Sequence, residues 1–138
     1  MSQIWTKWEP AEGLHNKYTI ASIVSSIDGF EILLYEDGLY GKKGLKIIFE
    51  NQVDSHRDTN ESLMGETIEE LNNQPVKLNY SQWTFFKVTN SEYIKWLRKQ
   101  SSGVADGRPF IHFCFVDDDS ILDVIACYEP KVEYIGKI

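Results

Sequence analysis

The chain has 138 residues, of which 42% are hydrophobic, and this is enough apolar material for one hydrophobic core. Its 21 aspartates and glutamates outnumber its 14 lysines and arginines, and the net charge of −7 argues against direct binding to nucleic acid, because phosphate recognition needs clustered cations. No run approaches the roughly 20 apolar residues of a membrane span and no secretory signal opens the sequence, so we expect no membrane contact and a cytoplasmic protein.

We expect a single domain over residues 1–138, because no repeat, linker or low-complexity tract divides the sequence. Residues 1–16 are polar around Trp5 and Trp8. They predict an ordered N-terminal arm whose indole rings cover an edge of the core.

Three strands are predicted after this arm. Residues 18–27 and 30–35 have the composition of strands, and Asp28-Gly29 between them is typical of a two-residue hairpin turn. Residues 45–50 supply the third strand, and the short connections make all three antiparallel.

A loop and a helix are predicted next. Residues 51–60 lack apolar periodicity and indicate a loop. Asn60 or Ser62 is then expected to cap a helix that ends before Pro75. One face of this helix carries Met64, Ile68 and Leu71, and the other carries mostly Glu66, Glu69 and Glu70.

A fourth strand and a second helix follow. Residues 83–88 alternate and are rich in aromatic side chains. Thr89 and Glu92 have the spacing of a capping box, which predicts a short helix through Gln100. The apolar residues of this helix that we expect to face the core are Tyr93, Ile94, Trp96 and Leu97.

The last part of the chain predicts a hairpin. Residues 110–116 and 121–128 are strongly apolar, the acidic turn 117–120 separates them, and residues 132–135 are a candidate final strand. The expected fold is therefore α+β, in the order β-β-β-α-β-α-β-β. It has a mostly antiparallel sheet of about six strands with two helices packed on it.

The two cysteines, Cys114 and Cys127, lie in apolar segments without Cys-x-x-Cys spacing. This favours buried, reduced thiols over a disulfide or a metal pair. A disulfide stays open as an alternative if the two segments pair as a hairpin.

Residues 54–73 hold most of the net charge. Six negative side chains and one positive side chain leave −5 of the total of −7. Such a surface suits a positively charged protein partner. The residues predicted to bind this partner are Asp54, Arg57, Asp58, Glu61, Glu66, Glu69 and Glu70. It is also open whether the acidic helix faces solvent or the basic side chains of Lys95 and Arg98.

Two other function classes compete with this interpretation. Asp54, His56 and Asp58 alternate along the chain, so they could converge to bind a divalent metal or to serve as a base in a small hydrolase. Exposed sheet edges and aromatic side chains would also suit a structural or regulatory homodimer. The sequence shows no nucleophile elbow, phosphate loop or dinucleotide fingerprint, which favours a binding function without catalytic residues, resident metal or cofactor.

Three segments together resemble small bacterial proteins of the immunity-protein kind. They are the Ser55-x-Arg57-x-Thr59-x-Glu61 run within residues 49–61, residues 83–88, and the hairpin of residues 113–130. Proteins of that kind are cytoplasmic, usually acidic, and neutralise a cognate toxin, often a basic nuclease, by covering its active site. The resemblance implies that the acidic loop and helix dock on such a toxin.

Overall fold

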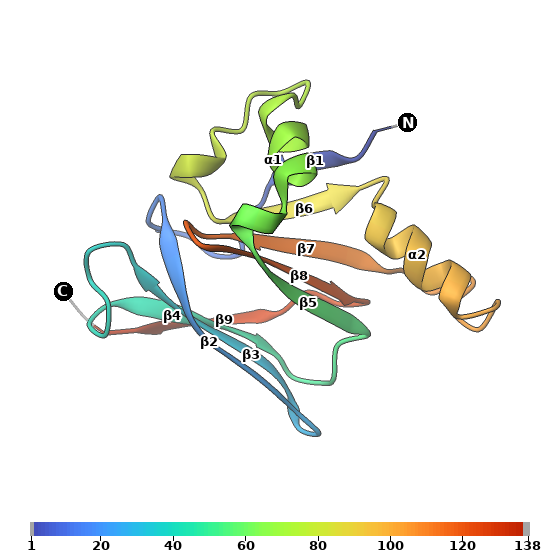
Figure 1. The fold of residues 1–138 in the computed structure, drawn as a ribbon. Helices are drawn as coiled ribbons and strands as arrows, with labels where there is room; N and C mark the ends of the chain where they lie inside the picture. The colour runs from blue at the N-terminus through green and yellow to red at the C-terminus, as the bar shows by residue number, and fades with distance from the viewer. Residues whose placement is uncertain (1, 137–138) are drawn as a thin grey trace.

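The computed structural model describes residues 2–136, and Figure 1 shows their course. Within these residues the chain forms nine strands, two α-helices and two short 3-10 helices. The strands are Ile4–Lys7 (β1), Tyr18–Ser26 (β2), Gly29–Glu36 (β3), Gly44–Phe49 (β4), Ser55–Asn60 (β5), Phe85–Thr89 (β6), Ile111–Val116 (β7), Ser120–Ala126 (β8) and Lys131–Ile135 (β9). The helices are Glu61–Leu63 (η1), Gly65–Asn72 (α1), Tyr80–Gln82 (η2) and Glu92–Gln100 (α2).

The strands form two antiparallel sheets. One sheet has five strands in the order β1-β6-β7-β8-β5, and the other has four in the order β2-β3-β4-β9. The α+β class is therefore confirmed, whereas the prediction of one sheet is wrong. Side-chain alternation identifies strands, but it does not say which of two sheets a strand joins.

The two sheets face each other across an aromatic core. The ring of Phe113 on β7 lies 5.4 Å from that of Phe49 on β4 and 4.9 Å from that of Trp8. Helices α1 and α2 lie on the other face of the five-stranded sheet (Figure 1). Strands β7 and β8 are consequently buried along almost their whole lengths.

The β2–β3 hairpin is confirmed, with its turn one residue earlier than predicted. Ser26 lies opposite Gly29, so the two turn residues are Ile27 and Asp28. Gly29 has a φ of +142°, and a Cβ atom at this position would lie 2.5 Å from the backbone oxygen of Phe49 on β4. Only glycine fits here, because β4 approaches too closely for a side chain.

The predicted N-terminal arm contains a strand. β1 pairs with β6, with Trp5 opposite Val88, and thereby becomes an edge of the five-stranded sheet. Trp5 and Trp8 are both buried, as the sequence predicted for their indole rings.

The loop predicted over residues 51–60 is wrong from Ser55 onward. Residues 55–60 form β5, which pairs with β8 at the opposite edge of the same sheet. Its side chains are polar and mostly exposed, so it lacks the apolar alternation by which strands are recognised.

Both helices begin later than predicted. Asn60 caps the 3-10 helix η1, and α1 then starts after Met64 without a side-chain cap. Ser91, not Thr89, caps α2, because its hydroxyl accepts a hydrogen bond from the Ile94 N–H. Thr89 is instead the last residue of β6.

The C-terminal hairpin of β7 and β8 is confirmed, and β9 is the final strand, paired with β4 in the other sheet. Both cysteines are free: Cys114 is buried and Cys127 is half-buried. The turn between β7 and β8 holds a buried carboxylate as well as exposed ones. The Asp117 side chain accepts hydrogen bonds from the N–H groups of Asp119 and Ser120.

The buried side chain of Lys17 connects the two sheets. Its side chain is 6% exposed, although lysine is usually found at the surface. The ammonium group donates to three backbone oxygens, those of Tyr80 at 2.8 Å, Trp83 at 3.0 Å and Val116 at 2.8 Å. Burial lowers the pKa of Lys17, while the nearby charge of Asp118 acts in the opposite direction.

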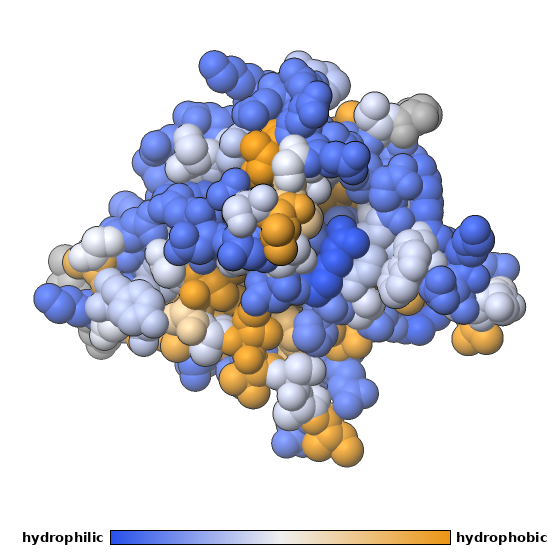
Figure 2. Space-filling view, in the orientation of Figure 1, coloured by the Kyte–Doolittle hydropathy of each residue, from blue (hydrophilic) through white to orange (hydrophobic). Residues whose placement is uncertain are grey.

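The surface is mostly polar. Figure 2 shows a largely hydrophilic surface, with hydrophobic residues along β2 and its hairpin and a smaller group over η1 and α1. No helix within residues 2–136 combines the length and apolarity that crossing a membrane requires.

Candidate functional site: an acidic groove

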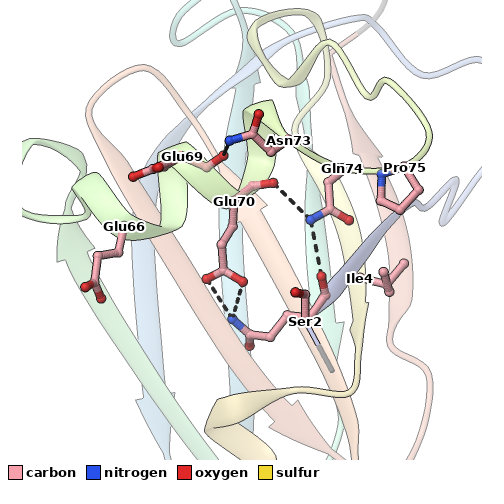
Figure 3. Close-up of a pocket in the computed structure, with 9 residues that line it drawn as sticks. Ser2, Ile4, Glu66, Glu69, Glu70, Asn73, Gln74 and Pro75 are labelled. Carbon is pink, nitrogen blue, oxygen red and sulfur yellow. Dashed lines mark hydrogen bonds between the residues drawn. The ribbon is translucent and has the colours of Figure 1, made fainter.

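An open groove of about 450 Å³ lies between α1 and the start of β1 (Figure 3). Three of its lining residues are glutamates and none is a lysine or arginine. The lining residues are Ser2, Gln3, Ile4, Glu66, Glu69, Glu70, Asn73, Gln74 and Pro75. The groove therefore carries a net negative charge.

Helix geometry brings the three glutamates together. Positions separated by three and four residues lie on the same side of an α-helix, and Glu66, Glu69 and Glu70 have this spacing. Figure 3 shows the side chains of Glu66 and Glu70 extending from α1 in the same direction. The opposite side of the helix contributes the buried Leu71 to the core.

The carboxylates of this groove have no cationic partner within residues 2–136. Glu70 accepts two hydrogen bonds from the neutral Gln3 amide, at 3.1 and 3.3 Å. Glu66 and Glu69 are exposed and form no ion pair with a described residue. Their negative charges are thus available to a ligand.

The helix itself makes two of these three charges unfavourable. Glu69 and Glu70 lie in the last turn of α1, which holds no basic residue. The C-terminal end of an α-helix already has partial negative charge, so cations are favoured there and anions are not. A cation bound in the groove would relieve this repulsion.

The basic residues of α2 do not neutralise the groove. Lys95 lies 3.7 Å from Glu92 on its own helix. Arg98 donates to the backbone oxygens of Ala105 and Arg108 at 2.9 Å each. Of the two alternatives left open by the sequence, the contacts of these residues favour an acidic helix that faces solvent.

The other predicted partner-binding residues lie outside the groove. Asp54 forms an ion pair with Arg108 at 2.6 Å, and Arg57 forms one with Asp123 at 2.9 Å, so intramolecular contacts occupy both. Asp58 is exposed on β5, and the next residue of the set, Glu61, starts η1. The seven predicted residues therefore divide between a groove on α1 and the region of β5.

A buried polar network lies beneath Arg57. His112 is 2% exposed and Asp123 is 3% exposed. The Nε2 atom of His112 lies 2.6 Å from Asp123 Oδ1, and its Nδ1 atom lies 2.7 Å from the Ser91 hydroxyl. A neutral imidazole satisfies both contacts when Nε2–H donates to Asp123 and Nδ1 accepts from Ser91.

This network has the residue types of a serine–histidine–aspartate triad but not its accessibility. Ser91 is 4% exposed, and its hydroxyl oxygen already accepts the Ile94 N–H as the cap of α2. A catalytic serine needs an oxygen that a substrate can reach. The network therefore has a structural role, which is to hold α2 on the sheet.

The same cluster is also the one place within residues 2–136 where three potential metal-ligating side chains converge. The ligand atoms of His112, Cys114 and Asp123 lie within 4.8 Å of one another. However, both oxygens of Asp123 already accept hydrogen bonds, from His112 and from the cationic Arg57. Burial also raises the pKa of Cys114 well above its usual value, which favours the thiol over the metal-binding thiolate.

The alternative metal set of Asp54, His56 and Asp58 is not brought together in this way. Asp54 is bound to Arg108, and His56 packs its ring 4.7 Å from that of Phe30. The geometry gives no support to a metal or base centre at these positions.

A second hollow of about 480 Å³ lies between β5 and α2. The guanidinium of Arg57 stacks 4.1 Å over the ring of Tyr93 there. Trp96, which was predicted to face the core, is 52% exposed and lines this hollow. Arg57 and Glu92 both line this hollow, so it has charges of both signs and does not favour a partner that is mainly positive or mainly negative.

Sequence reasoning missed Gln74, which lines the acidic groove and closes one side of it. Its side chain accepts the Trp5 N–H at 2.9 Å and donates to the Gln3 backbone oxygen at 3.2 Å. No sequence signal marks a glutamine in a polar loop for such a role.

Comparisons with protein-family models, curated proteins and solved structures found no match to the chain.

Proposed function

We propose that this protein is a non-enzymatic binding domain whose acidic groove receives a basic segment of a partner protein. The observation behind this proposal is the lining of the groove, where three glutamates meet no lysine or arginine. An immunity-type inhibitor, which covers a basic toxin or nuclease, is the specific form of this function that the resemblance favours.

The electrostatics support this proposal in two ways. A lysine or arginine side chain in the groove would offset the repulsion between Glu69, Glu70 and the C-terminal end of α1. The net charge of −7 would speed the encounter with a basic protein at low salt. A protein that keeps such repulsion unrelieved loses stability, which is typical of functional sites.

Reversing Glu66 and Glu69 to lysine should weaken the complex by about 10- to 100-fold at low salt, because each change replaces an attraction with a repulsion. Both side chains are exposed, so the fold should survive with little change in melting temperature. The measurement is capture of proteins from a host-cell lysate on the immobilised chain, followed by mass spectrometry and by titration of the captured protein.

The matched control is the pair Glu12→Lys and Glu133→Lys, which changes the net charge equally at two exposed positions outside the groove. The proposal expects the control to retain the basic partner that the groove variant loses. Equal retention by both variants would overturn the assignment of the groove. For the immunity-type form, the captured protein should be a toxin or nuclease that the wild-type chain inhibits and the groove variant does not.

A further inference from the structure

One side of strand β1 is not paired with another strand. It is an edge strand, and its pairing with β6 uses alternate residues. Because the Trp8 N–H bonds to the Phe85 oxygen, the register directs the N–H and C=O groups of Gln3, Trp5 and Lys7 away from β6. Such a row of backbone groups is a template for another strand.

Gln74 occupies one position of this template. Its carboxamide accepts from the Trp5 N–H and donates to the Gln3 oxygen, as a peptide group of a neighbouring strand would do. Beyond it, the Trp5 oxygen and the Lys7 N–H have no hydrogen-bond partner within residues 2–136. The edge is therefore only partly closed.

Gln74 also separates two hollows. The acidic groove lies on one side, and a hollow of about 490 Å³ lies on the other, between the end of α1 and residues 77–81. Gln74 is the one residue that lines both of them. Its side chain thus stands where an extended ligand along β1 would pass.

We propose that an extended, lysine- or arginine-containing segment of the partner protein pairs with β1 as a sixth strand of the sheet. Its backbone takes over the hydrogen bonds that Gln74 makes, and every second side chain points toward Glu66, Glu69 and Glu70. The charge of the groove selects the basic segment, and the edge of β1 fixes its conformation. This inference rests on the proposed function of the groove.

The test uses a fluorescent hexapeptide of alternating threonine and lysine, together with two versions that are N-methylated on all threonines or on all lysines. In a paired strand the N–H groups of alternate residues face the neighbouring strand, so only one of the two methylated peptides should lose binding. The expected loss is about tenfold or more, because several backbone hydrogen bonds disappear together. The other methylated peptide should bind within about threefold of the unmodified one.

Amide chemical shifts locate the peptide independently of affinity. We expect the largest changes at the backbone N–H groups of Trp5 and Lys7 and at the side-chain amide of Gln74. The variant Gln74→Ala should bind the unmodified peptide about three- to tenfold more tightly, because no side chain then competes for the edge. Its circular dichroism spectrum provides the check that the fold is retained.

The outcomes separate the two proposals. If all three peptides bind equally and Glu66→Lys with Glu69→Lys abolishes binding, strand pairing is overturned and the acidic site stands. If none of the peptides binds at low salt, both the strand pairing and the proposed function of the groove are overturned.

Discussion

Replacing Asp123 with alanine should lower the free energy of unfolding by about 1–3 kcal/mol, the usual cost of leaving a buried hydrogen-bond donor without its partner. The change leaves the buried Nε2–H of His112 without an acceptor and removes the counter-charge of Arg57. Asp123→Asn keeps the shape of the side chain and should cost about half as much. Urea unfolding followed by tryptophan fluorescence measures both values.

The control for this series is Asp119→Ala, at an exposed position in the neighbouring turn, which should change stability by no more than about 0.5 kcal/mol. A double-mutant cycle with Arg57→Gln identifies the pair directly. If Asp123 and Arg57 act as one unit, the loss of unfolding free energy in the double variant should be smaller than the sum of the losses in the two single variants. Full additivity would show that the ion pair contributes nothing.

The same carboxylate gives stability a pH dependence. Burial alone would raise the pKa of Asp123, but its hydrogen bonds from His112 and Arg57 and the positive charge of Arg57 outweigh burial and lower that pKa below 3.8. The stabilisation is therefore complete above the unfolded-state pKa of about 3.9 and is lost as the pH falls through the lower folded-state pKa. The urea midpoint of the wild-type chain should fall more steeply below pH 4 than that of Asp123→Asn.

Replacing Lys17 with methionine should cost about 2–4 kcal/mol, because backbone oxygens that lose their donor inside the protein are left unsatisfied. Two of the three hydrogen bonds of this ammonium group are fully buried, and they connect the residue before β2 to Trp83, just before β6, and to Val116 at the end of β7. Methionine retains most of the apolar stem, so the loss reports on the ammonium group and not on packing.

The comparison variant is Lys42→Met, which makes the same chemical change at an exposed lysine and should stay within about 0.5 kcal/mol of the wild type. Thermal unfolding by calorimetry measures both variants. Equal stability of the Lys17 and Lys42 variants would contradict the role of Lys17 as a link between the sheets.

The sequence predicted strands well where their side chains alternate or are uniformly apolar. Both tight hairpins, β2–β3 and β7–β8, follow from short apolar runs separated by turn residues. Strands β1 and β5 were missed because they are edge strands with many polar side chains, and their strand conformation comes from pairing with β6 and β8. Pairing between distant segments leaves no local pattern to read.

The candidate site, like the fold, was predictable where local spacing determines the structure and not where contacts between distant residues do. The spacing of Glu66, Glu69 and Glu70 follows from helix geometry, and the structure places all three in one groove. The ion pairs of Asp54 with Arg108 and of Arg57 with Asp123 each join residues more than 50 positions apart. The sequence does not reveal contacts of this kind. The hydrogen bonds of Gln74 to β1 are of the same long-range kind.

The position of residues 2–4 in the wall of the groove has a practical consequence for every binding assay proposed above. A purification tag added ahead of residue 2 would emerge beside Glu66 and Glu70, and a polyhistidine tag could itself enter the groove as a basic ligand. The other end of the described chain leaves from β9 in the opposite sheet, well away from α1 (Figure 1). A tag or a surface linkage belongs at that end.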